Sequence, residues 1–85
     1  MTTPAVEHQP QHNRFVCDTG NGEAVITYRL NGNIIDFDHT YVPGSARGRG
    51  IAALLVDTAA AWARTQGYTL TASCWYARDY LQLQR

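Results

Sequence analysis

The dipeptide Asn31-Gly32 lies between two runs of residues in which apolar and polar side chains alternate. Alternation with period two, over residues 23–30 and again over residues 33–42, is typical of β-strands with one buried face. An Asn-Gly pair favours a two-residue type I′ turn, because both central positions of that turn need a positive φ angle. We therefore predict an antiparallel β-hairpin whose turn is centred on Asn31 and Gly32.

The two faces of the second of these strands differ in hydrophobicity. One face holds Ile35, Phe37, His39 and Tyr41, and the other holds Ile34, Asp36, Asp38 and Thr40. The first face is the more apolar, so we expect it to pack on the core and His39 to share it. An earlier apolar run, Phe15-Val16-Cys17, precedes the turn-forming residues 19–22 and predicts one more strand, with Cys17 in the core.

The period changes at Ile51, where apolar residues begin to recur every three or four positions. The stripe consists of Ile51, Leu54, Leu55, Thr58, Ala59 and Trp62. This spacing is that of one face of an α-helix, and Gly67 suits the position after its last turn. Residues 68–72 predict a further strand, parallel to and beside the strand at 33–42. The last segment predicts a short helix with inward-facing Tyr76, Tyr80 and Leu81.

Length and composition indicate one small globular domain. The chain has 85 residues, of which 45% are apolar and 16% charged. Residues 1–13 are polar and offer little to bury, so we expect a flexible N-terminal tail followed by a single domain over residues 14–85. The expected fold class is α+β: a mostly antiparallel sheet of about four strands, one main helix packed on it and a short C-terminal helix.

Charge and cysteine content narrow the classes of partner. Seven basic residues balance seven acidic ones, so we expect neither a nucleic-acid surface nor a membrane surface. Cys17 and Cys74 can form at most one disulfide, and we interpret both as free thiols. The chain shows no secretory signal and no run of about 20 apolar residues, so we expect a cytoplasmic protein.

A metal site is not predicted. His8 and His12 have the i, i+4 spacing of two ligands on a helix, and the other candidate ligands are Cys17, His39 and Cys74. The segment around His8 and His12 has the composition of a tail, and no paired cysteine motif accompanies it. We therefore expect no metal.

The segment most informative about function is Arg47-Gly48-Arg49-Gly50-Ile51-Ala52, between the hairpin and the helix. Glycines let the backbone approach a ligand, and the first amides of a helix lack internal partners, so phosphate oxygens can bind there. The alternative is an ordinary glycine-rich loop with two solvated arginines. The ending of a P-loop and the third glycine of a dinucleotide fingerprint are both missing, which excludes those two classes of site.

The pattern Arg-x-x-Gly-x-Ala, from Arg47 through Gly50 to Ala52, resembles the coenzyme A loop of the GCN5-related N-acetyltransferases. Together with the neighbouring motifs it resembles the small, single-domain YjdJ-type acetyltransferase-like family over roughly residues 15–81. Those motifs are His39-Thr40-Tyr41-Val42-Pro43, Leu55-Val56, Cys74-x-Tyr76 and Tyr80-Leu81.

This resemblance implies a minimal acetyltransferase fold that binds acetyl-CoA and moves its acetyl group to an unidentified amine. It implies that the pyrophosphate binds the backbone amides of residues 49–52, and that the pantetheine arm lies beside Val42. Two positions depart from the family's pattern: Tyr41 stands where an acidic residue is frequent, and Ala72 where a proline is frequent. The first departure removes a candidate base. We expect a monomer or a homodimer.

Cys74 and His39 are the candidate catalytic residues. The Cys74 thiol could accept the acetyl group or only line the pocket, and His39 could act as a base or be a hydrogen-bonded core residue. Tyr76 could protonate the departing thiolate or close the core, and for Tyr80 we favour a core role. Two other interpretations stay open: a non-catalytic acyl-CoA-binding or protein-interaction module, and a structural domain without a ligand.

Overall fold

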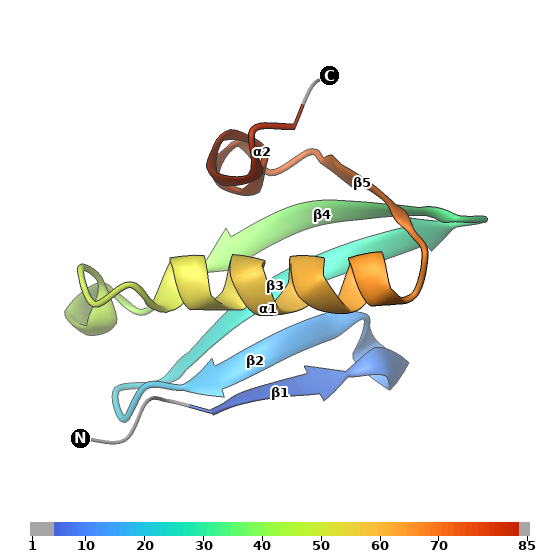
Figure 1. Ribbon diagram of the computed structural model, residues 1–85. Coiled ribbons are helices and arrows are strands. Elements are labelled where there is room, and N and C mark those ends of the chain that lie inside the picture. Colours follow the sequence, from blue (N-terminus) through green and yellow to red (C-terminus); the bar gives the residue numbers. More distant parts are fainter. Residues whose placement is uncertain (1–4, 84–85) are drawn as a thin grey trace.

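A computed structural model describes residues 5–83 as one mixed β-sheet with two α-helices (Figure 1). The elements are β1 Val6–Gln9, β2 Arg14–Asp18, β3 Glu23–Asn31, β4 Ile34–Tyr41, α1 Ile51–Thr65, β5 Thr69–Ala72 and α2 Trp75–Leu81. The strands lie in the order β1-β2-β3-β4-β5. Every pairing is antiparallel except that of β4 with β5, which is parallel. The predicted α+β class is therefore confirmed.

The hairpin between β3 and β4 is confirmed, with its turn displaced by one residue. Asn31 still pairs with Ile34, so Gly32 and Asn33 form the two-residue turn. Gly32 has a φ angle of 60°, whereas Asn33 does not have a positive φ. A positive φ at the first central position alone is the pattern of a type II′ turn, which favours glycine there. The predicted type I′ turn is wrong for this reason.

A β-bulge in β4 changes which face its side chains occupy. Thr27 of β3 pairs with His39, and the next residue of β3 pairs with Phe37, so Asp38 is an extra residue in β4. One extra residue reverses the alternation that follows it. Phe37 is therefore fully buried, His39 is exposed and Thr40 turns toward the helices. The expectation that His39 shares the core face with Phe37 is wrong, and the bulge is the physical reason.

Helix α1 and strand β5 form where they are predicted, but the buried face of α1 is turned relative to the predicted stripe, because Leu54, Thr58 and Trp62 are only half-buried. The buried face of α1 consists of Ile51, Leu55, Val56, Ala59, Ala60 and Ala63. Gly67 has a φ angle of 84°, which lets the chain leave the helix and turn back along the sheet. β5 then runs parallel to β4, with Ile34 opposite Thr69. The predicted parallel pairing is confirmed.

The N-terminal segment is part of the sheet, which corrects the predicted tail and the predicted number of strands. Val6–Gln9 pairs with β2, and a 3₁₀ turn follows it. The His8 ring stacks on Phe15 at a centroid distance of 4.0 Å, and its Nε2 lies 2.8 Å from the Tyr28 hydroxyl. These contacts give a polar segment enough buried surface to join the sheet, which has five strands. Residues 1–4 of the predicted tail lie outside the described residues.

Both helices pack on the same side of the sheet. A single hydrophobic core joins strand residues such as Ile26 and Phe37 to Leu55 of α1 and Ala77 of α2. Cys17 belongs to this core, as predicted. Within residues 5–83, no helix is long and apolar enough to cross a membrane.

Candidate functional site

Strands β4 and β5 pair along part of their length and then separate. Residues 34–37 of β4 pair with residues 69–72 of β5. The Cys74 amide still donates to the Phe37 carbonyl at 3.0 Å, but β4 continues to Tyr41 while the chain after Cys74 turns into α2. We call the opening between the two diverging segments the fork. A pocket of about 710 Å³ lies there.

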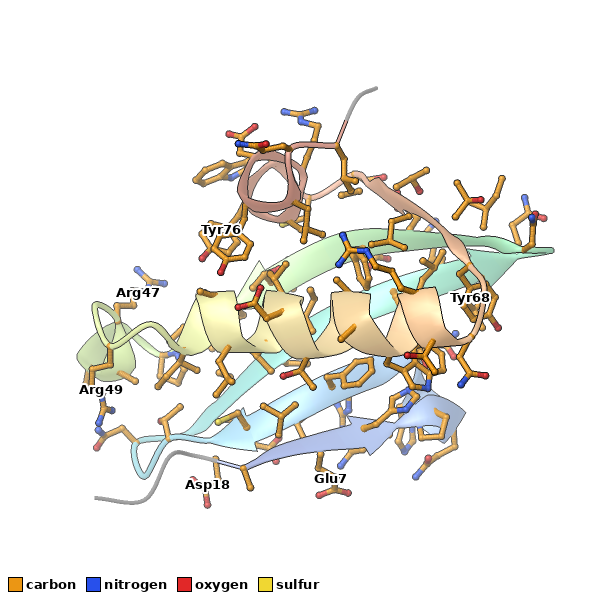
Figure 2. All side chains as sticks on the ribbon, in the orientation of Figure 1. Glu7, Asp18, Arg47, Arg49, Tyr68 and Tyr76 are labelled. Carbon is orange, nitrogen blue, oxygen red and sulfur yellow. The ribbon has the colours of Figure 1, made fainter. Side chains whose placement is uncertain are left out.

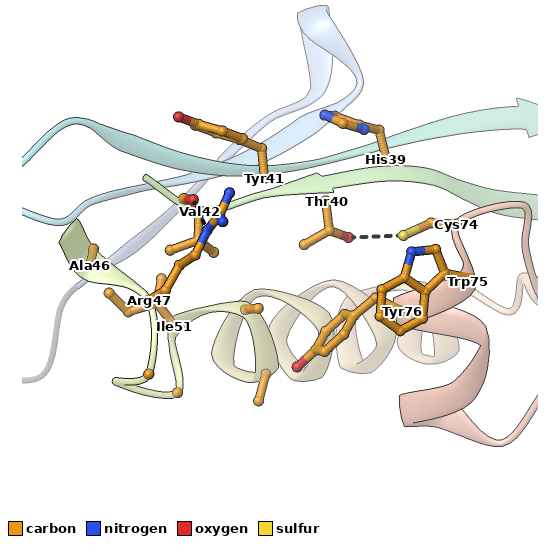
Figure 3. Close-up of a pocket in the computed structure, with 14 residues that line it drawn as sticks. His39, Thr40, Tyr41, Val42, Ala46, Arg47, Ile51, Cys74, Trp75 and Tyr76 are labelled. Atoms are coloured by element: carbon orange, nitrogen blue, oxygen red, sulfur yellow. Dashed lines mark hydrogen bonds between the residues drawn. The ribbon is translucent and has the colours of Figure 1, made fainter. Parts of the chain in front are cut away.

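The pocket is walled by three segments that are distant in the sequence (Figure 3). These are the end of β4, the loop that leads into the first turn of α1, and the start of α2. Its lining consists of His39, Thr40, Tyr41, Val42, Ala46, Arg47, Gly48, Gly50, Ile51, Ala52, Ala53, Cys74, Trp75 and Tyr76. Of the predicted site residues, Arg49 is the one absent from this lining. Small-molecule sites commonly have volumes of about 300–1,000 Å³, so the size suits a ligand.

The loop before α1 presents backbone amides to this pocket. Gly48 and Gly50 have φ angles of 85° and 76°, and Gly50 caps the helix without a side-chain hydrogen bond. Within residues 5–83, the amides of Ile51, Ala52 and Ala53 have no hydrogen-bond acceptor, and the first turn holds no acidic side chain. Unpaired amides at a helix N-terminus attract anions, since the helix dipole adds positive potential there. The arrangement suits a phosphate group.

The two loop arginines point in different directions. The Arg47 Nε donates to the Val42 carbonyl at 3.0 Å, which keeps its side chain along the pocket wall. The Arg49 Nη2 instead donates to the Thr19 carbonyl, in the hairpin between β2 and β3, at 3.5 Å. Figure 2 shows both arginines at the loop end of the molecule. The two arginines therefore do not lie together at the pocket, contrary to the expectation from the sequence. Arg49 turns to the β2–β3 hairpin instead, and the position of that hairpin cannot be derived from the loop sequence.

Cys74 and Thr40 meet across the fork. The Cys74 Sγ donates to the Thr40 Oγ1 at 3.5 Å, and both side chains are half-buried. Thr40 was not among the predicted site residues, because the bulge turns it toward the pocket. The sequence does contain one signal of this change: in β4 the apolar residues Ile35 and Phe37 that are buried have odd numbers, whereas Val42, the next buried apolar residue, has an even number.

Comparison with known proteins agrees with this geometry. The family model described as GCN5-related N-acetyl-transferase matches residues 14–85, which include the whole fork and the loop before α1. The chain belongs to the GCN5-related N-acetyltransferase family. Members of this family generally use acetyl-CoA as the acetyl donor, and the matched residues include the loop before α1 and the pocket lining.

Relatives of this family member share most of its length. Protein NATD1 from Mus musculus is 34% identical over 80 residues, which cover 91% of this chain and 73% of that protein. Protein NATD1 from Gallus gallus is 32% identical over 80 residues, with coverages of 91% and 73%. The solution structure of a GCN5-like protein from Staphylococcus aureus superposes with a TM-score of 0.74 and 30% identity, covering 96% of this chain and 81% of that one. The minimal acetyltransferase fold is therefore confirmed. The narrower YjdJ-type resemblance stays a prediction.

His39 lies at the rim of this family member's pocket. Its ring and that of Tyr41 project from β4 on the side away from Cys74 (Figure 3). His39 is exposed, so the alternative of a buried core histidine is wrong. The two predicted catalytic residues therefore lie on opposite sides of β4, and the structure does not bring them into contact.

Tyr76 and Tyr80 stack on each other but have different environments. Tyr76 is half-buried and lines the pocket, and burial raises the pKa of its hydroxyl, with further contributions from Asp57 and Cys74. Tyr80 is 42% exposed and donates to the Asp57 carboxylate at 3.0 Å, a hydrogen bond that raises the pKa of Tyr80. The favoured core role of Tyr80 is wrong, because this hydrogen bond holds its ring at the surface. Of these two tyrosines, Tyr76 is the one that lines the pocket.

The described residues contain no cluster of three histidine, cysteine, aspartate or glutamate side chains that could hold a metal ion. His8, one of the metal-ligand candidates, is stacked against Phe15 and bonded to Tyr28 instead.

Proposed function

We propose that this protein binds acetyl-CoA in the pocket at the fork and transfers the acetyl group to a primary amine. The observation that carries the proposal is the continuity of one pocket, from the unpaired amides of Ile51 and Ala52 to the Cys74 thiol. Acetyl-CoA supplies a diphosphate and, at the other end of its pantetheine arm, an activated thioester. The pocket offers a complementary group to each.

The loop supports binding of the diphosphate. A Cβ atom at Gly48 or Gly50 would meet nothing within 4 Å, so open space lies in front of the amides. Arg47, held beside the pocket by its hydrogen bond to Val42, adds a positive charge and further donors. Val42 and Ile51 contribute apolar wall to the pocket, which suits the pantetheine arm. Arg49 has no part in this arrangement.

Direct transfer needs a neutral amine, a base and a proton donor. The amine nitrogen attacks the thioester carbonyl, a C–N bond forms, the C–S bond breaks and the departing thiolate takes up a proton. Tyr76 can donate that proton, because a tyrosine hydroxyl is protonated at neutral pH and burial raises the pKa of this one further. His39, exposed at the rim, can accept the proton that the amine nitrogen loses.

Cys74 offers a two-step route to the same product. The Cys74 thiol loses its proton to solvent and the sulfur attacks the thioester carbonyl. The C–S bond to CoA then breaks and the departing thiolate takes up a proton, so that Cys74 becomes acetylated and CoA leaves as its thiol. The amine then attacks the acetyl-cysteine, which restores the Cys74 thiol. Before the reaction, the hydrogen bond that the Cys74 thiol donates to Thr40 holds the sulfur at the fork.

The experiment that tests this proposal measures release of the CoA thiol from acetyl-CoA in the presence of primary amines. We expect release that depends on the amine. Tyr76→Phe should slow it by at least about 10-fold, within the range of general acid catalysis, whereas the matched control Tyr80→Phe should leave it unchanged. Binding of CoA without any amine-dependent release would identify a non-catalytic acyl-CoA-binding module, and absence of both would overturn the proposal.

The variant Cys74→Ala distinguishes direct transfer from transfer through acetylated Cys74. If transfer is direct, this variant retains release and the wild-type protein gains no mass from acetyl-CoA alone. If Cys74 carries the acetyl group, the variant is inactive and the intact mass of the wild type increases by one acetyl group before any amine is added.

A further inference from the structure

The side of the sheet opposite the helices carries most of the acidic residues. Side chains that alternate with the core residues of β1 to β4 point to this side, which we call the outer face. Its charged residues are Glu7, Asp18, Glu23, Asp36, Asp38, Arg14 and Arg29. Five carboxylates against two arginines give this face a net charge of −3, although the formal net charge of the chain is zero.

Residues 44–83, which include both helices, carry a net charge of +2. Residues 44–83 contain four arginines and two aspartates: Arg47, Arg49, Arg64, Arg78, Asp57 and Asp79. In Figure 2 the two loop arginines flank the start of α1, whereas Glu7 and Asp18 point away from that helix. The protein therefore has a cationic side, which contains the anion-binding loop, and an acidic side without a helix among the described residues.

The arginines of the outer face are already engaged. The Arg29 Nε lies 3.0 Å from the Asp38 Oδ2, and the Arg14 Nε donates to the Gln9 Oε1 at 2.7 Å. Within residues 5–83, no ion pair involves the other carboxylates of this face. Asp18 and Glu23 are moreover directly opposite each other in the β2–β3 pair, where like charges destabilise a sheet. This face is suited to a cationic partner from outside the described chain.

The part of β4 that lines the pocket lies between acidic residues at the two ends of the outer face. His39 and Tyr41 line the pocket and project on the outer face (Figure 3). Asp36, opposite Arg29, lies on one side of them, and Glu23 lies on the other. The seven residues of β3 from Glu23 to Arg29 are separated by six steps, which span roughly 20 Å at about 3.3 Å per residue. An extended peptide of similar length covers this distance, with its central side chain over the fork.

We infer that the outer face docks a basic, extended peptide and presents one of its lysines to the fork. The inference rests on the proposed function, because that lysine is then the acetyl acceptor. Asp18 and Glu23 attract a cationic side chain on one side of the lysine, and Asp36 attracts one on the other. Charge complementarity of this kind steers a partner and fixes its register. A small amine lacks the flanking charges and is the poorer ligand.

The test uses fluorescence anisotropy of a labelled heptapeptide with a central lysine and an arginine on each side. We expect the wild-type protein to bind it, and binding to weaken as salt rises from about 50 to 200 mM. In the double variant Asp18→Asn/Glu23→Gln we expect binding about 3- to 10-fold weaker, the loss of two exposed charge pairs. This variant also removes the repulsion between Asp18 and Glu23, so we expect it to fold as the wild type does. Circular dichroism checks that it is folded.

The matched control Asp57→Asn/Asp79→Asn removes the same charge from the helix side. We expect it to bind the peptide as the wild type does, and both double variants to bind CoA equally. No peptide binding by the wild type, or equal weakening in both double variants, would overturn the inference even if CoA binds. Peptide binding without any CoA binding would instead leave the docking surface standing and contradict the proposed function.

Discussion

The Cys74 thiol donates a hydrogen bond to the Thr40 hydroxyl across the fork, although the two residues are 34 positions apart in the chain. The contact joins the end of β4 to the start of α2, at the end of the pocket opposite the unpaired amides of α1. It exists because the extra residue Asp38 reverses the alternation of β4. A single bulge therefore decides which β4 side chain reaches the reactive end of the site.

Thr40→Val tests whether this contact positions Cys74. Valine has the shape of threonine but cannot accept the hydrogen bond, so we expect the free energy of unfolding to change by less than about 1.5 kcal/mol. If Cys74 carries the acetyl group, thiol release should nevertheless fall several-fold, because the sulfur is no longer held at the fork. Thr58→Val, which removes a half-buried hydroxyl from α1 outside the pocket lining, is the control. Equal rates of thiol release in Thr40→Val and Thr58→Val would show that Thr40 has no specific role in the site.

Gly50→Ala tests the loop geometry. The left-handed conformation of Gly50, with a φ angle of 76°, disfavours a Cβ atom, so alanine should destabilise the fold by about 1–2 kcal/mol. Gly67, with a φ angle of 84°, is a matched control outside the pocket lining, and Gly67→Ala should cost a similar amount. Urea denaturation measures both changes. We expect only Gly50→Ala to weaken CoA binding, and similar weakening in both would show an effect of stability alone.

The stability of the fold should depend on pH through His8. Burial lowers the pKa of His8 below its ordinary value of 6.5, so the folded protein favours the neutral ring. As the pH falls through about 6.5 the unfolded chain gains a proton that the folded protein does not, so stability is full above this pH and decreases below it. Urea midpoints measured from about pH 7.5 to 5.5 should record the decrease.

His8→Phe is the control for this pH dependence. It keeps the ring against Phe15 but leaves the buried Tyr28 hydroxyl without its partner, so it should lower stability by about 1–3 kcal/mol at every pH. The decrease between about pH 7.5 and 5.5 should become much shallower. An unchanged slope would show that other groups cause it.

The parts of the fold that follow from local periodicity could be predicted from the sequence. Alternation over residues 23–30 and the stripe that begins at Ile51 each describe one element packed on one core, so each identified its element correctly. The loop from Arg47 to Ala52 was predicted as a candidate site for a similar reason. Glycines before a helix N-terminus let a ligand reach unpaired backbone amides, and this property depends only on neighbouring residues. All of its residues except Arg49 line the pocket.

The missed features depend on contacts between distant residues. β1 has only Val6 and His8 to bury, and their burial requires the Phe15 and Tyr28 rings on other strands. The bulge at Asp38 reverses which face of the sheet the later side chains of β4 occupy, although the sequence of β4 shows no break in its alternation. His39 was therefore assigned to the wrong face, and Thr40 was overlooked. Such features become visible only when the sheet is assembled.

The central claim is that coenzyme A binds the first turn of α1, and calorimetric titration with CoA tests it most directly. Ala53→Glu places a carboxylate in that turn, where it suits the helix dipole but repels the diphosphate. Ala61→Glu places the same side chain on the exposed surface of the same helix. We predict that the wild type and Ala61→Glu bind CoA with equal Kd, and that Ala53→Glu binds at least about 100-fold more weakly. Equal binding by all three proteins, or no heat from the wild type at millimolar CoA, would contradict the account.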